Sequence, residues 1–207
     1  MTQAIDVRPS ITSEWFRAGL ERARACFDEM GSGEFCAQLQ HVAGEVARRL
    51  AAGGTVYWCG NGGSSSDSQH LAAELVGRFG RPGRGWPSVA LSADSSVLTA
   101  AGNDFGFETV FQRQVAALVR REDAVVGIST SGASRNVVAA IREARRKGAL
   151  TLALTGPGGG LVAGAAELVI RAPGESTSDI QTCHIAVGQL LCEAAIALAE
   201  AGEEDHD

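Results

Sequence analysis

The sequence predicts an α/β fold in which a parallel sheet of five strands lies between two layers of helices, the doubly wound arrangement. Five short apolar segments alternate with helical patterns along the chain, and this alternation is typical of doubly wound sheets. The apolar segments are continuous rather than alternating with polar residues, which indicates strands that are covered on both faces.

Two amphipathic helices are expected to precede the sheet. Residues 13–30 place Phe16, Leu20 and Phe27 on one stripe, and residues 35–52 carry apolar residues at the same helical spacing. Glycines follow each of the two patterns, as they commonly do at helix ends. The two helices are expected either to cover the sheet or to build an oligomer interface.

The α/β part is expected to extend from residue 55 to residue 201. Its strands are predicted at residues 55–59, 88–91, 124–128, 150–154 and 168–170. Its helices are predicted at residues 65–78, 107–121, 134–147, 160–165 and 177–201. A length of 207 residues suits one domain. We therefore expect a single domain over residues 1–207, with the helical pair at 13–52 and the α/β core and C-terminal helix at 55–201.

The composition excludes several classes of protein. A formal net charge of −6 gives no electrostatic support for nucleic-acid binding. The apolar runs are shorter than the roughly 18 residues that a membrane span needs, and the first residues do not resemble a signal peptide. Five scattered cysteines without CxxC spacing indicate reduced thiols. The sequence thus predicts a cytoplasmic protein with no nucleic-acid or membrane partner.

Polar clusters follow the predicted strands, at the sheet edge where open α/β sheets bind ligands. They are Asn61-Gly62-Gly63-Ser64 after the first strand, Asp94 and then Asn103-Asp104 after the second, Ser129-Thr130-Ser131-Gly132-Ala133-Ser134 after the third, and the glycine-rich 155–160 segment after the fourth. Hydroxyls at a helix start form a phosphate cradle that needs no lysine. The alternative is an ordinary N-cap turn. Neither a GxGxxG motif nor a P-loop is present.

His70 and Glu74 lie four residues apart on one face of the helix that follows the first cluster. Such a pair can act as a base with an imidazole, or can hold one divalent metal ion; the alternative is a solvated surface pair. In the last helix, Gln181 either caps the helix through Ser178 or faces a ligand. His184 is either a core histidine or a functional one, and its spacing does not decide between them.

Several segments together resemble the phosphoheptose isomerases of the SIS (sugar isomerase) group. They are GNGGSSSDSQHLAAEL, AGNDFGF, GISTSGASRNV, LTGPGGG and IQTCHIAVGQLLCE, and they run in order over roughly residues 15–198. The resemblance implies an SIS-type sandwich. It also implies the aldose–ketose isomerisation of sedoheptulose 7-phosphate to D-glycero-D-manno-heptose 7-phosphate through a cis-enediol, in nucleotide-activated heptose biosynthesis. Such enzymes are cytoplasmic homotetramers with shared active sites, and many hold zinc.

The resemblance also assigns roles to individual residues. It implies substrate contacts for Asn61, Gly62, Gly63, Glu74, Asn103, Asp104, Ser129, Thr130, Ser131, Ser134 and Gln181, with the four hydroxyl residues holding the phosphate. Glu74 would be the catalytic base. The implied zinc ligands are His70, Glu74, Gln181 and the residue at position 189.

Position 189 departs from the family pattern. The isomerases have a histidine there, which serves as acid/base and zinc ligand, whereas this chain has Gln189. Glutamine can donate a hydrogen bond or offer its carbonyl oxygen to a metal, but it cannot transfer a proton near neutral pH. Gln189 is therefore a candidate catalytic residue and zinc ligand with weakened chemistry. Two explanations of Gln189 are compatible with the sequence: a naturally divergent enzyme, or an altered and weakened form of one.

Two other functions are compatible with parts of the pattern. The first is a non-catalytic SIS module that binds a sugar phosphate or acts through protein contacts; Glu74 argues against it and Gln189 argues for it. The second is an isomerase of a six-carbon phosphosugar, which the segments around His70 and Gln181 match less well.

Overall fold

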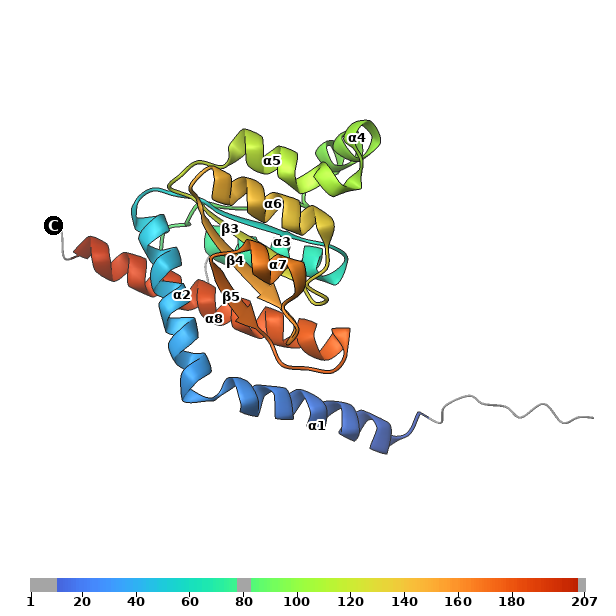
Figure 1. Cartoon of the computed structure of the whole chain (residues 1–207). Coiled ribbons are helices and arrows are strands. Elements are labelled where there is room, and N and C mark those ends of the chain that lie inside the picture. Colours follow the sequence, from blue (N-terminus) through green and yellow to red (C-terminus); the bar gives the residue numbers. More distant parts are fainter. Residues whose placement is uncertain (1–10, 78–82, 205–207) are drawn as a thin grey trace, which may run out of the picture.

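A computed structural model describes residues 11–77 and 83–204 and has the predicted α/β architecture, shown in Figure 1. Its five strands are β1 Val56–Gly60, β2 Ser88–Ala90, β3 Ala124–Ser129, β4 Leu150–Thr155 and β5 Leu168–Arg171. They are all parallel, in the order β2-β1-β3-β4-β5. The chain therefore reverses its winding direction between β1 and β3, the position where ligands bind in sheets of this order.

Helices cover both faces of the sheet. They are α1 Ser13–Met30, α2 Gly33–Ala51, α3 Gly63–Val76, α4 Ser95–Phe105, α5 Val110–Leu118, α6 Arg135–Arg146, α7 Gly160–Ala165 and α8 Thr177–Glu204, with a 3₁₀ turn, η1, at Phe107–Thr109. Side chains of α2, α3 and α8 pack with one face of the sheet. Side chains of α4, α5, α6 and α7 pack with the other. The central strands β1, β3 and β4 are buried along their whole length, which explains their continuous apolar sequences.

The segment between β2 and β3 differs from the prediction. Residues 95–105 form α4, which the sequence analysis did not predict, so Asn103 and Asp104 lie near the end of a helix rather than in a turn after a strand. Asp94 caps α4 by accepting a hydrogen bond from the Val97 backbone N–H at 3.0 Å. The helix predicted at 107–121 is divided into η1 and the shorter α5. The predicted end of the third helix, residue 78, lies outside the described residues.

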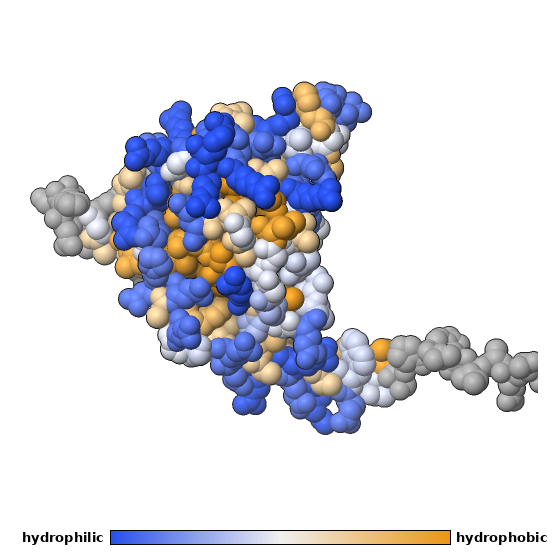
Figure 2. Space-filling view, in the orientation of Figure 1, coloured by the Kyte–Doolittle hydropathy of each residue, from blue (hydrophilic) through white to orange (hydrophobic). Residues whose placement is uncertain are grey.

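The helix α1 extends away from the sheet in Figure 1. Its buried residues are Cys26 and Met30, close to its C-terminal end, while Trp15, Phe16 and Leu20 are 55, 58 and 73% exposed. By contrast, α2 buries a continuous apolar face in the core that it shares with α8. Figure 2 shows a different exposed surface, with hydrophilic side chains over α5 and α6 and an apolar area below them over α7 and the β5 edge.

The C-terminal helix α8 is a core helix of unusual length. Its segment from Thr177 to Gly202 is long and apolar enough to cross a membrane by length and composition. However, 44% of the most apolar part is buried inside the molecule, where Val187, Leu191 and Ala195 join the core with α2 and α3. Buried core helices of soluble proteins meet the same criterion, so α8 is not evidence of a membrane span.

Two glycines allow α3 and α8 to lie close together. A Cβ atom on Gly188 of α8 would lie 2.4 Å from the Leu71 side chain of α3, which is fully buried. A Cβ atom on Gly63 of α3 would lie 2.0 Å from the Gln181 amide of α8. The N-terminal part of α3 thus meets the N-terminal part of α8, and the later parts also meet, so the two helices run in parallel.

Because Leu71 cannot move without disturbing the core, we expect Gly188→Ala to lower the free energy of unfolding. The expected loss is about 1–3 kcal/mol, the usual cost of an extra methyl group in a packed interior, measured by urea unfolding. The control is Gly44→Ala in α2, where no described atom beyond the adjoining helix backbone lies within 4 Å of the added Cβ. It should not destabilise the protein, since alanine is favoured over glycine in helices by about 1 kcal/mol. Equal effects of the two substitutions would contradict the close approach.

Candidate active site

The turn after β1 leads through Asn61 and Gly62 into α3. Gly62 has φ +56°, in the left-handed region that favours glycine. The backbone N–H groups of Ser64 and Ser65 donate to the carbonyl oxygens of Asn61 and Gly62 at 3.1 and 3.0 Å. These two N–H groups are therefore not free for an anion, contrary to what a glycine-rich helix start suggests.

A pair of asparagine amides connects this turn to the next one along the sheet. The Asn61 amide nitrogen donates to the Asn136 side-chain oxygen at 2.9 Å, and the Asn136 nitrogen donates back at 2.8 Å. Asn136 is 3% exposed and lies in the first turn of α6. Asn136 was not among the predicted site residues, because nothing in the sequence shows that its partner is 75 residues away. The pair fixes the turn after β1 against the turn after β3.

The turn after β3 is the serine-rich cradle of the sequence analysis. Ser129 and Ser134 share a hydrogen bond between their hydroxyl groups at 3.0 Å. The backbone N–H groups of Ser131, Ser134 and Arg135 have no acceptor in the described part of the chain. Free N–H groups at the start of a helix and nearby hydroxyls are the donors that bind a phosphate. The turn therefore offers an uncharged anion site.

The turn after β4 packs against this cradle. Gly132 has φ +64°, and a Cβ there would lie 2.2 Å from the Gly159 carbonyl oxygen. The Gly156 N–H donates to Thr130 O at 3.1 Å, and the Val162 N–H donates to Gly132 O at 2.9 Å. The glycine-rich segment 155–160 thus shapes the cradle through backbone contacts.

The cation that follows the cradle in the sequence is directed elsewhere. Arg135 follows Ser134, but its guanidinium donates to Glu108 of η1 at 3.0 Å, and both side chains are mostly exposed. This ion pair connects η1 to the start of α6. The hydroxyls and backbone N–H groups therefore remain the principal donors of the cradle.

His70 and Glu74 form the predicted pair on α3, with Gln189 of α8 beside them. His70 Nε2 lies 2.9 Å from Glu74 Oε1 and 3.1 Å from the Gln189 amide nitrogen. Their side chains are accessible, since His70 is 47% and Glu74 22% exposed. The donor and acceptor roles between His70 and Gln189 depend on the tautomer of the imidazole.

Gln181 lies at the other end of the contact between α3 and α8. Its amide rests against Gly63 and makes a side-chain hydrogen bond with Asp67. Asp67 and Gln181 border an open cavity of about 280 Å³. Asp67 was not among the predicted site residues, and it is 8% exposed although it lies in a serine-rich segment. Burial raises the pKa of its carboxyl, and the hydrogen bond with Gln181 and the charge of His70 oppose this increase.

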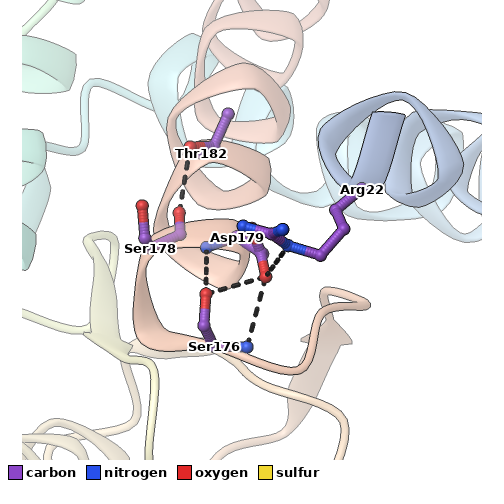
Figure 3. Close-up of polar contacts among 5 residues, drawn as sticks. All are labelled: Arg22, Ser176, Ser178, Asp179 and Thr182. Atoms are coloured by element: carbon purple, nitrogen blue, oxygen red, sulfur yellow. Dashed lines mark hydrogen bonds and ion pairs between the residues drawn. The ribbon is translucent and has the colours of Figure 1, made fainter. Parts of the chain in front are cut away.

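The start of α8 settles the question of which residues cap it. Figure 3 shows Ser176 and Asp179 forming the reciprocal cap. Ser176 Oγ accepts from the Asp179 N–H at 3.1 Å, and Asp179 Oδ2 accepts from the Ser176 N–H at 3.3 Å. Arg22 of α1 lies 3.8 Å from the same carboxylate. The Ser178–Gln181 cap considered from the sequence is therefore wrong, and Gln181 is not needed to cap the helix.

His184 is a core histidine. It is 1% exposed, burial lowers its pKa, and neither ring nitrogen has a hydrogen-bond partner among the described residues. The neutral form is thus favoured. It also points to a different side of α8 from Gln189, because five residues correspond to about 140° of helical rotation.

The remaining candidates, Asn103 and Asp104, lie near the C-terminal end of α4. Asn103 donates to Asp104 at 2.8 Å, and both are exposed. Asp104 borders an apolar groove of about 660 Å³ between α4 and α5. No hydrogen bond of the described residues joins either side chain to the cradle.

The arrangement partly suits a metal ion. Among residues 11–77 and 83–204, no group of three His, Cys, Asp or Glu side chains is suitably placed. His70, Glu74 and the Gln189 amide do converge, and their separations of 2.9 and 3.1 Å approach the roughly 3.3 Å between ligands of a tetrahedral zinc ion. Gln181 lies eight residues before Gln189, about 12 Å along the helix. One chain thus brings together three of the four candidate ligands.

Comparison with known proteins gives a consistent result. Residues 23–156 match the family model described as SIS domain. The chain is 49% identical over 177 residues to a phosphoheptose isomerase of Rhodospirillum rubrum, covering 85% of this chain and 93% of that protein. It is 52% identical over 155 residues to the corresponding protein of Akkermansia muciniphila, covering 75% and 82%.

A solved structure is also similar. The phosphoheptose isomerase of Neisseria gonorrhoeae matches with a TM-score of 0.82 and 36% identity, over 89% of this chain and 98% of that one.

If the cradle binds phosphate, inorganic phosphate should stabilise the protein against thermal unfolding. At ten to a hundred times the dissociation constant, the expected gain is about 1.4–2.7 kcal/mol, and Ser134→Ala should reduce it because a hydroxyl donor is lost. Ser96→Ala, at an exposed serine of α4, is the matched control, and sodium chloride of equal ionic strength controls for salt. Equal stabilisation of all three proteins would place the anion elsewhere.

Proposed function

The chain belongs to the phosphoheptose isomerase family of SIS-fold enzymes, and we propose that it converts sedoheptulose 7-phosphate to D-glycero-D-manno-heptose 7-phosphate for nucleotide-activated heptose biosynthesis. The non-catalytic SIS module considered from the sequence is not favoured, because relatives of about 50% identity are named as isomerases. The accessible Glu74 carboxylate beside His70 is the observation that carries the proposal.

Glu74 is the base in this proposal. Its carboxylate takes a proton from C1 of the ketose while O2 gains a proton, which gives a cis-enediol. The carboxylate then returns its proton to C2 while the C1 hydroxyl loses its proton, which gives the aldose. His70 keeps the carboxylate oriented through the 2.9 Å contact. A positioned base of this kind contributes about 10²–10⁴-fold to a rate. The phosphate is held by Ser129, Thr130, Ser131 and Ser134, and Gln181, Asn61, Gly62 and Gly63 contact the rest of the substrate.

Zinc is the proposed cofactor. His70, Glu74 and Gln189 would hold the ion. Gln181 lies about 12 Å along α8 from Gln189, so the Gln181 that completes the ligand set would come from another subunit. Bound zinc would act as a Lewis acid on the carbonyl oxygen of the substrate. Two of these ligands are neutral amides, which suit zinc less well than imidazole does. The expected affinity is therefore lower than that of a site with a second histidine.

The distances along α3 support an active site shared between subunits. Gly63 begins α3 at the ligand-binding edge of the sheet, whereas His70 and Glu74 lie about 10 and 16 Å further along its axis. A heptose phosphate that occupies the cradle cannot readily reach Glu74 of the same chain. We therefore propose that Glu74 of one subunit acts on a substrate held by another, with Asn103 and Asp104 also completing a neighbouring site.

The exposed side chains of α1 support the same assembly. Trp15, Phe16, Leu20 and Phe27 are 42–73% exposed on a helix that covers little of its own sheet. Large apolar residues gathered on one helix are typical of a subunit interface. We propose a homotetramer in the cytoplasm, where the five unpaired cysteines would stay reduced.

Glu74→Gln should reduce the kcat for sedoheptulose 7-phosphate by about 10²-fold or more, since the amide cannot take up a proton. The loss should appear in kcat rather than in KM, because the amide keeps the size of the carboxylate. Glu34→Gln, at an exposed position of α2, is the control for loss of one negative charge. Turnover of this substrate by the unmodified protein is the first measurement, and its absence would refute the proposed function.

Gln189→His should raise kcat by about 10²–10⁴-fold, the contribution of one acid/base group, because an imidazole titrates near neutral pH. Zinc affinity, measured by titration calorimetry, should rise as well. The matched control is Gln189→Asn, which keeps the amide but shortens its reach to His70. A histidine variant with unchanged kcat and zinc affinity would exclude Gln189 from both roles.

A further inference from the structure

Asp67 is a buried carboxylate that the proposed reaction does not use. It lies on α3 between Gly63 and His70, and its side chain faces α8, where it borders the cavity with Gln181 and Thr182. Its Oδ2 atom is buried and has no hydrogen-bond partner among the described residues. Burial of a carboxylate is costly unless its interactions compensate, so a buried aspartate at the edge of a candidate site suggests a specific task.

The partner of Asp67 is Gln181, and the chemistry of the pair fixes the direction of the hydrogen bond. An ionised carboxylate can only accept, so the Gln181 amide nitrogen is the donor. The amide oxygen is then left to face other groups. Without Asp67 the two ends of the amide would be almost equivalent in shape, and either could face the site.

Gly63 provides the second constraint on the same amide. The position that a Cβ on Gly63 would occupy lies 2.0 Å from the Gln181 nitrogen and 2.4 Å from its oxygen. The amide therefore lies directly over the Gly63 backbone, beside the turn that follows β1. Contact with Gly63 limits where the amide can lie, and the hydrogen bond with Asp67 determines whether the amide nitrogen or the amide oxygen faces Asp67.

We propose that Asp67 is a positioning residue that holds the Gln181 amide with its carbonyl oxygen toward the substrate. The site then presents an acceptor at this point, which suits a hydroxyl group of the sugar chain. This inference rests on the proposed function for the identity of the substrate, but it concerns the orientation of one side chain.

The test exchanges the donor and the acceptor. Asp67→Asn offers an NH₂ group to the Gln181 oxygen, which turns the Gln181 nitrogen toward the substrate, and KM should rise about 10-fold or more with a nearly unchanged kcat. Combining Asp67→Asn with Gln181→Glu restores an acceptor at this point. The amide introduced at position 67 then donates to the carboxylate introduced at position 181, whose second oxygen faces the substrate. The double variant should have a KM close to that of the wild-type protein.

Ser68→Ala is the matched control. Ser68 is also buried on α3, but its hydroxyl donates to the Ser64 carbonyl of its own helix, at 2.8 Å. It should leave KM unchanged. A wild-type KM in Asp67→Asn, or a double variant that is no better than the single one, overturns the proposal. If Asp67→Asn does not fold, the double variant decides alone, because it keeps the same number of charges and hydrogen bonds.

A measurement without substrate separates this inference from the proposed function. In ¹⁵N-labelled protein, one side-chain NH₂ proton of Gln181 should exchange slowly with solvent, and this protection should be lost in Asp67→Ala. Protection without turnover of sedoheptulose 7-phosphate would refute the function alone. Turnover with an unprotected Gln181 amide would refute the role of Asp67 alone.

Discussion

The parallel packing of α3 against α8 is the constraint on which the candidate site depends. Each helix supplies one glycine for a side chain of the other, Gly63 for Gln181 and Gly188 for Leu71. Two such contacts, about two turns apart, determine both the separation and the register of the helices. The register also sets the neighbours of these contact residues, so His70, next to Leu71, lies beside Gln189, next to Gly188. A shift of either helix by one residue would separate the imidazole from the amide.

The same packing divides the chemistry of the molecule into two regions. The cradle after β3 offers uncharged donors and contains no base, whereas the group around His70 contains a base and an imidazole but lies well along α3. Neither region can perform an isomerisation alone. The fold positions each region within a subunit, and the proposed assembly would bring the base of one subunit to the cradle of another.

Much of this fold is predictable from the sequence, since buried strands require continuous apolar residues and helix ends favour glycine. The helix α4 was missed because only one of its eleven residues, Ala101, is buried, so its sequence does not mark a core-facing side. Asn136 and Asp67 were missed for a different reason, as their roles depend on distant partners. At the start of α8, two overlapping cap patterns compete, and the aspartate at 179 forms the cap where the sequence suggested Gln181. Local motifs can be identified from the sequence, but packing decides which of two neighbouring motifs forms.

The pairing of Arg135 with Glu108 has a consequence for the encounter with substrate. Cationic binding sites attract phosphates over a distance, and dissolved salt weakens that attraction by screening it. In the proposed phosphate site, the cradle would act through hydroxyls and backbone dipoles, which work only at contact, on a chain of net charge −6. The long-range force on an approaching anion is then repulsive, and screening removes it. Rising ionic strength should accelerate the capture of an anion by this protein, the opposite of the behaviour of a lysine-lined site.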